Sequence, residues 1–114
     1  MNTATETTPD LVVIRVWRGD DNDIFALFPE LSASYNGYDV TCYQHIGQHS
    51  AADYCGCIRQ SRPATPEEAA PLLEELRHIG YNPRVIKRAP YAMHRKRIDE
   101  MRKANHELMA KSAG

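Results

Sequence analysis

The change of pattern at Thr65 limits the possible folds more than any other feature of this sequence. The residues before it form short stretches rich in β-branched and aromatic side chains, separated by turn residues, and such stretches are typical of strands. The residues after it include TPEEAAPLLEELRHIG (65–80), in which apolar side chains recur at helical spacing. Strands followed by helices predict an α+β fold: an antiparallel sheet of four to five strands with one packed helix and a basic C-terminal helix.

The segment 65–80 carries helix signals at both of its ends. Thr65 can cap the first turn, Pro66 suits the first helical position, and Glu68 completes a capping box. Gly80 suits the position that follows the last turn. Pro71 conflicts with this pattern because it lacks a backbone donor, so we expect a kink there or a separate first turn.

Five segments have the β-branched, aromatic and alternating side chains of strands, namely 11–18, 24–28, 38–46, 54–60 and 81–88. In the first of them Val12, Ile14 and Val16 should share one face, because side chains alternate along a strand. Pro29 should end the second strand. Residues 47–53 are rich in small and polar side chains, and we expect them to form a connection between the third and fourth strands.

The chain has 114 residues, which is enough for one domain and too few for two with separate cores. We divide it into a flexible tail (1–10), an α+β domain (11–89) and a C-terminal helix with a short tail (90–114). No stretch approaches the ~20 apolar residues that span a bilayer, and the N-terminus lacks the pattern of a signal peptide. We therefore expect a cytoplasmic protein without a membrane partner.

The C-terminal helix, which we expect from Pro90 to about residue 110, has a narrow apolar stripe. The stripe follows heptad spacing and consists of Tyr91, His94, Ile98, Met101, Asn105 and Leu108. A lone helix of this length is marginally stable in water, so an ordered helix must have its stripe covered. We expect the helix to dock on its own domain, and a homodimer through this helix is the alternative.

Residues 42–57, CYQHIGQHSAADYCGC, hold every cysteine of the chain together with two histidines and an aspartate. A zinc site would need about four converging ligands, drawn from Cys42, His45, His49, Asp53, Cys55 and Cys57. If the region folds into two paired strands, however, the three cysteines share one face and His45 points to the other. We therefore predict no metal ion and no cofactor, with Cys42 and at least one of Cys55 and Cys57 as small core residues.

Two enzymatic interpretations use the same region. A cysteine nucleophile needs a histidine within hydrogen-bond reach and a group that orients it, and His49, Asp53 and Cys55 could supply these parts. No helix N-terminus is predicted beside Cys55 to lower the pKa of its thiol. A small hydrolase or metalloprotein centred on His45, His49 and Asp53 is the other interpretation, and the chain carries no recognised catalytic motif for either.

The favoured interpretation of this region is a recognition surface. Many of its side chains combine an apolar body with a polar tip, and such side chains suit contacts with another protein. The candidate binding residues are Tyr43, Gln44, His45, Gln48, His49, Asp53 and Tyr54. The sequence thus favours a non-enzymatic interaction protein with a protein partner.

Charge is distributed unevenly along the chain. Residues 1–83 carry 12 acidic and 5 basic side chains, whereas residues 84–114 carry 9 basic and 3 acidic ones. Basic charge with interleaved aromatic rings suits a phosphate backbone, so a nucleic-acid binder using the basic segment 84–103 is a further alternative. Its weak candidates are Arg84, Lys87, Arg88, Arg95, Lys96 and Arg97. The chain as a whole is not basic, since its net charge is −1.

The acidic loop that contains Asp20, Asp21 and Asp23 invites a calcium interpretation. It lacks the glycine and the terminal glutamate that an EF-hand loop requires at fixed positions. We interpret this loop as a solvated hairpin tip.

At ALFPELSA…YQHIGQHSAADY…RPATPEE…LRHIGYNPRVIKR the sequence resembles a family of short hypothetical proteins encoded on bacterial phages, plasmids and integrative elements. The resemblance covers roughly residues 11–90. It is most specific at a Y-x-H-x-G-Q-H core made of Tyr43, His45, Gly47, Gln48 and His49. It carries over no catalytic residues and implies only a context, a mobile-element accessory protein in a bacterial cytoplasm. Modulation of a host protein is our hypothesis for such an accessory.

Overall fold

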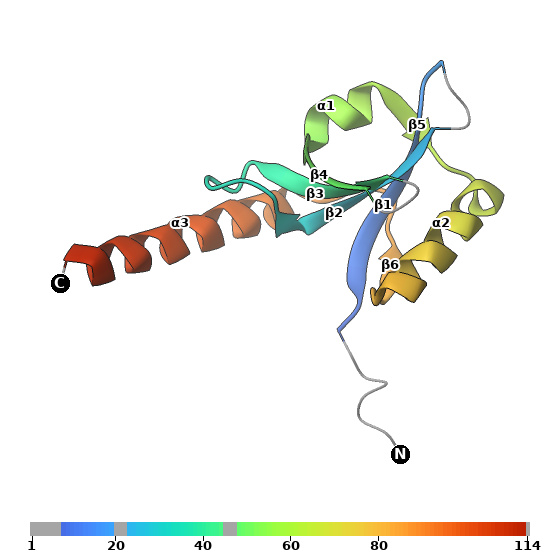
Figure 1. Cartoon of the computed structure of the whole chain (residues 1–114). Coiled ribbons are helices and arrows are strands. Elements are labelled where there is room, and N and C mark those ends of the chain that lie inside the picture. Colours follow the sequence, from blue (N-terminus) through green and yellow to red (C-terminus); the bar gives the residue numbers. More distant parts are fainter. Residues whose placement is uncertain (1–7, 20–22, 45–47, 114) are drawn as a thin grey trace.

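The computed structural model describes residues 8–19, 23–44 and 48–113, which form a mixed sheet and three helices (Figure 1). Their order along the chain is β1 (Asp10–Trp17), β2 (Ile24–Ser32), β3 (Asp39–Gln44), β4 (Gln48–Asp53), α1 (Tyr54–Arg59), β5 (Ser61–Pro63), α2 (Pro66–Ile79), β6 (Pro83–Val85) and α3 (Tyr91–Ala113). The predicted α+β fold with a C-terminal helix is confirmed.

The sheet has the strand order β4-β3-β2-β1-β5, and all of these neighbours pair antiparallel. The outer edge of β1 is shared by two short strands. β5 pairs with Arg15–Trp17, whereas β6 runs parallel to β1 and pairs with Asp10–Val12. β1 is therefore a central strand along most of its length, which agrees with its buried residues on both faces.

α2 covers one face of the sheet. The buried side chains of this first core are Val12, Ile14, Ala26, Phe28, Tyr43, Ala69, Leu72 and Leu76. The capping box is present, because the Thr65 hydroxyl accepts a hydrogen bond from the Glu68 amide at 3.1 Å and the Glu68 carboxylate accepts one from the Thr65 amide at 2.9 Å. Gly80 follows the last turn with φ of 124°, as predicted.

A second core lies on the opposite face, beneath α1 and the segment that leads into α3. Its buried side chains are Val13, Phe25, Leu27, Val40, Cys42, Tyr54 and Ala89. The predicted alternation in β1 is confirmed for its central residues, since Val12 and Ile14 lie in the first core and Val13 lies in the second. The expectation that Cys42 is a core residue is also confirmed.

α3 docks on its own chain, as predicted, but its contact is centred on a charged residue. Arg97 is 4% exposed and donates hydrogen bonds to the carbonyl oxygens of Pro29 at 2.6 Å and Gly37 at 2.7 Å. Asn105 donates a further bond to the Tyr35 carbonyl at 2.8 Å. These carbonyls belong to the end of β2 and the turn before β3, so α3 lies along this corner of the sheet (Figure 1).

The ends of the predicted apolar stripe are not covered by the body. Tyr91 is 76% exposed and Leu108 is 60% exposed, whereas Ile98 and Met101 are half-buried. Gly37 is the reason that the middle of the stripe approaches so closely. A Cβ atom at this position would lie 3.0 Å from the Ile98 backbone, and the φ of +80° also favours glycine.

Four expectations about the extent of the elements need correction. Residues 48–53 form the strand β4 and not a connection, because their backbone pairs antiparallel with β3 along its whole length. β2 continues through Pro29 to Ser32, and the register shift between Phe28 and Ser32 accommodates the missing donor. α2 continues through Pro71 without a separate first turn, and the strand expected at 81–88 is shortened to β6.

The segment 54–60 was predicted to be a strand and forms the helix α1. The carbonyl groups of its last turn are bonded by buried side chains from elsewhere. The Ser61 hydroxyl donates to the Cys57 carbonyl at 2.6 Å, and the Arg15 guanidinium donates to the Ile58 carbonyl at 3.1 Å. Tertiary contacts therefore override the β propensity of this short segment.

Candidate functional site

The predicted recognition surface divides into a buried part and an exposed part. Tyr43 and Tyr54 are buried in the two cores, and Gln44 is half-buried, so they offer little to a partner. Gln48, His49 and Asp53 are exposed on β4. His45 lies outside the described residues.

His49 and Tyr43 meet two residues that come from the second half of the chain. The Tyr43 hydroxyl donates a hydrogen bond to the carboxylate of Glu75 on α2. His49 Nε2 lies 3.0 Å from the Tyr81 hydroxyl, and its ring meets the Tyr43 ring edge-on at 4.9 Å. Burial, and secondarily the charge of Asp10, raises the pKa of the Tyr81 phenol, which therefore stays protonated at neutral pH.

This tyrosine–histidine cluster, made of Tyr43, His49, Glu75 and Tyr81, connects β4 to α2 and to the segment before β6. Tyr81 also stacks on Phe28 of the first core, with ring centroids 4.6 Å apart. The sequence analysis missed Glu75 and Tyr81. Their distance from His49 along the chain leaves no local pattern, and only the fold brings them together. The contacts of the cluster hold β4 in place and leave its outer edge exposed.

The three cysteines differ in burial, and the expectation that no helix N-terminus lies beside Cys55 is wrong, since α1 begins at Tyr54. Cys42 is buried, and burial together with the nearby Cys57 raises the pKa of its thiol to about 11. Burial also raises the pKa of the half-buried Cys57, mainly through lost solvation. Both thiols are protonated at neutral pH, and the thiol is a poor nucleophile and metal ligand. Cys55 is exposed on the first turn of α1.

The set of proposed metal ligands does not converge within the part of the chain that the structure describes. No group of three histidine, cysteine or acidic side chains is placed there to hold a metal ion. The face argument made from sequence was based on a wrong element, since Cys55 and Cys57 lie on α1 and not on a strand. The hydrolase and metalloprotein interpretations centred on His45, His49 and Asp53 therefore gain no geometric support from the described residues.

β4 lies at one edge of the sheet. Among the described residues it pairs only with β3, and five of its six side chains are exposed. The middle of the strand, Ser50–Ala52, consists of small residues. The strand contains no proline and no lysine, two residue types that commonly block the edge of a sheet. The backbone groups on the outer side of β4 are thus accessible to another extended chain.

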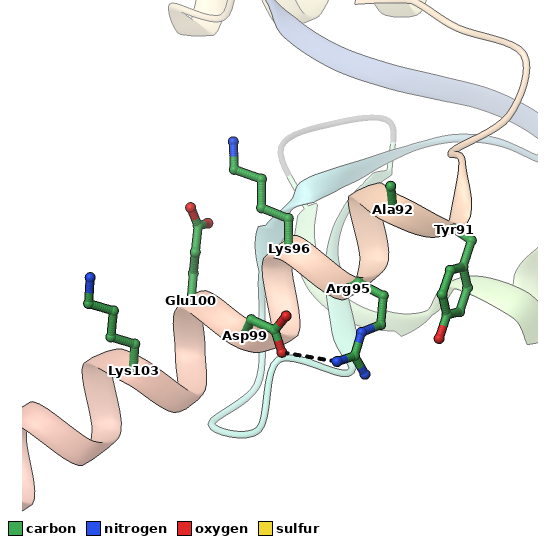
Figure 2. A pocket seen from close by; sticks show the side chains of 7 residues that line it. All are labelled: Tyr91, Ala92, Arg95, Lys96, Asp99, Glu100 and Lys103. Atoms are coloured by element: carbon green, nitrogen blue, oxygen red, sulfur yellow. Dashed lines mark ion pairs between the residues drawn. The ribbon is translucent and has the colours of Figure 1, made fainter.

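The nucleic-acid candidates are distributed differently from the prediction. Arg97 is buried and serves the docking of α3, so it is removed from the set. The exposed face of α3 carries acids among its bases, and Arg95 pairs with Asp99 at 3.5 Å (Figure 2). The carboxylate of Glu100 lies beside Lys96 in the same view. A face of mixed charge binds a phosphate backbone poorly.

The cations of the preceding segment, Arg84, Lys87 and Arg88, are all exposed. They lie on β6 and on the linker that follows it, and not on the helix that carries Arg95. Asp20 and Asp21 of the acidic loop lie outside the described residues. The carbonyl of Asp23 accepts a hydrogen bond from the Trp17 amide at 3.0 Å and closes the hairpin on its described side.

Comparisons with models of protein families, with curated proteins and with solved structures found no match to this chain. Within the described residues, the helices are too short or too polar for a membrane crossing. The candidate site is therefore defined by its geometry alone, and its main feature is the accessible edge of β4.

Proposed function

We propose that this protein is a non-enzymatic interaction protein that binds an extended segment of a partner protein through the edge of β4. The observation that carries the proposal is the accessible, unblocked edge of a six-residue strand in the region where sequence analysis expects a recognition surface. Strand addition is a common mode of peptide recognition.

Main-chain hydrogen bonds would supply the affinity in this mode. Each such bond contributes a net ~0.5–1.5 kcal/mol, and alternate residues of β4 direct both backbone groups outward. The small side chains of Ser50 and Ala51 leave room for an incoming backbone. Gln48, His49 and Asp53 flank them and provide polar contacts for specificity.

The tyrosine–histidine cluster supports the proposal because it holds the strand in place before a partner arrives. His49 is bonded to Tyr81, and Tyr43 is bonded to Glu75, so β4 does not need to be ordered by the partner. A preorganised edge loses less conformational entropy on binding. On the resemblance to proteins of mobile elements, we propose a host protein as the partner, with both proteins in the bacterial cytoplasm.

Two proline variants test the edge directly. Neighbouring residues of a strand direct their amides to opposite sides, so Ser50→Pro and Ala51→Pro differ in which amide they remove. One variant removes a bond to β3 and should melt at a lower temperature. The other removes only an outward donor, and its melting temperature should stay close to that of the unmodified protein.

The binding measurement uses peptides selected on the unmodified protein from a random display library. We expect the variant with the unchanged melting temperature to lose these peptides, and bound peptide to slow amide hydrogen exchange in β4. Selected peptides that bind both variants equally well, or that protect another region, would refute the proposal. A homodimer that dissociates in the same variant would assign the edge to a second copy of the chain and would also refute it.

A further inference from the structure

A groove near the opposite edge of the sheet, on the face that α2 covers, is independent of the β4 edge and of the function proposed for it. It has a volume of about 610 Å³ and lies where α2, β6 and the turn after β5 meet. Its lining residues are Ile14, Pro63, Ala64, Thr65, Pro66, Ala69, Ala70, Leu73, Glu74, Arg77, Val85, Ile86 and Lys87. A cavity of this size is in the range of sites for small molecules, roughly 300–1,000 Å³.

The groove exists because α2 does not cover the whole first face of the sheet. The helix directs Leu72 and Leu76 into the core, while Leu73 lies half-buried on its flank. β5 ends at Pro63, opposite Arg15, and β6 ends at Val85, opposite Val12, so these strands occupy only the two ends of the β1 edge. Ile14, between those ends, lies in the wall of the groove.

The apolar wall remains accessible at its rim. Val85 of β6 is 49% exposed although it is a large apolar residue, and Leu73 lies on the α2 side of the same groove. Figure 1 shows α2 next to β6, with β5 near the end where α2 begins. Three elements thus surround an apolar hollow, which suits a compact ligand better than a flat protein surface.

The charged groups of the groove are two cations and one carboxylate. Arg77 and Glu74 form an exposed ion pair at 3.3 Å on α2, so they largely neutralise each other. Lys87 stands on the opposite side, and within the described residues no ion pair involves it. One uncompensated cation beside an apolar hollow is complementary to a ligand with an apolar body and one anionic group.

We propose that this groove binds a small amphipathic carboxylate, with the aliphatic or aromatic body against Leu73 and Val85 and the carboxylate at Lys87. The apolar area supplies the affinity through burial from water. Lys87 selects the charged end group, because a charge-assisted hydrogen bond is stronger than a neutral one. The ammonium has three donors and a flexible stem, so it can follow end groups at different depths of the groove.

The probe is decanoate below its critical micelle concentration, with decanol as the matched neutral probe. We expect decanoate to bind the full chain at one site, seen by calorimetry and by amide shifts of α2 and β6 in NMR spectra. Decanol should bind roughly tenfold more weakly, which is one step of 1.4 kcal/mol. Equal affinity for the two probes, or no decanoate binding, would overturn the proposal.

Two variants locate the site. Val85→Trp fills the groove from an exposed position and should abolish binding of both probes without unfolding the chain. Lys87→Met keeps the length of the side chain and should weaken decanoate about tenfold while leaving decanol unchanged. Lys96→Met on α3 is the control and should change neither affinity. Decanoate affinity that is insensitive to both groove variants, or that falls equally in the Lys96 control, would refute the assignment.

Discussion

The helices α2 and α3 both pack on the same sheet, but different interactions hold them. α2 presents a continuous apolar face, and Ala69, Leu72 and Leu76 are buried in the first core. α3 is held mainly through Arg97, whose guanidinium bonds to backbone carbonyls of the body. The first kind of packing follows from the spacing of apolar residues. The second depends on carbonyl groups that no sequence pattern places.

The comparison predicts that truncating a leucine has very different consequences on the two helices. Leu76→Ala should cost about 2–5 kcal/mol of unfolding free energy, because Leu76 is 0% exposed in the first core. Leu108→Ala removes the same atoms from a side chain that is 60% exposed, and should change stability by no more than about 0.5 kcal/mol. Urea denaturation measures both values. Similar losses would mean that a partner or a second copy covers the end of α3.

Two arginines of α3, one buried and one exposed, give a second test of how this helix is held. Arg97→Met keeps an unbranched stem but leaves the carbonyls of Pro29 and Gly37 without this donor, at a cost of about 2–3 kcal/mol. Arg95→Met breaks only an exposed ion pair with Asp99 and should cost about 0.5 kcal/mol or less.

Chemical denaturation gives the two free energies, and limited proteolysis reports whether α3 has detached. We expect fast cleavage within α3 in the Arg97 variant alone. If both variants resist the protease to the same degree, the role of Arg97 in docking would have to be abandoned. The same pair bears on the sequence-based expectation that Arg97 contacts nucleic acid, because its side chain is buried against the body.

Acid should weaken the two helices in separate pH ranges. Burial, and then the charge of Arg97, lowers the pKa of His94 on α3 from its ordinary value of 6.5. As the pH falls, the unfolded chain therefore protonates His94 before the folded chain does. The contribution of neutral His94 to the free energy of unfolding is present above pH 6.5 and decreases as the pH falls below it. The ring packs against Tyr54, and its Nδ1 lies 2.9 Å from Arg97, so protonation disfavours the docked state.

On α2 the corresponding group is Glu68. The paired guanidinium of Arg62, at 2.7 Å, and the amide of Thr65 lower the pKa of this carboxyl to about 2. Its contribution is present above the ordinary value of 4.5 and is lost as the pH falls towards 2. Melting curves recorded between pH 8 and pH 2 should show both steps. His94→Gln should remove only the upper step and Glu68→Gln only the lower one, and a variant that removes both would contradict the separation.

The sequence predicted those parts of the fold that depend on neighbours along the chain. The capping box of α2, the alternation in β1 and the docking of α3 were all predicted from local patterns and are confirmed. Residues 54–60 were not, because the helix α1 is completed by bonds from Arg15 and Ser61, and Arg15 is far away in the sequence. Local propensity cannot report a donor that the fold supplies.

The candidate site also has a part that local sequence predicts and a part that only the fold assembles. Sequence analysis placed the recognition surface at residues 43–54, and part of that set is exposed on an accessible strand. It could not identify β4 as an edge, since the order of strands is a property of the whole sheet. Glu75 and Tyr81 of the tyrosine–histidine cluster, and the groove between α2 and β6, are likewise assembled from segments that are distant in sequence.

The close approach between Gly37 and α3 restricts which residues can occupy position 37 in related chains. The turn before β3 and the helix α3 are separated by about sixty residues in the chain, yet they share a space that admits no Cβ atom without displacement of Ile98. A side chain at position 37 would therefore need α3 to give way by a few tenths of an ångström, and the φ of +80° would strain it in addition. Two separate constraints thus act on this one position, so the turn before β3 and the helix packed on it both favour glycine there.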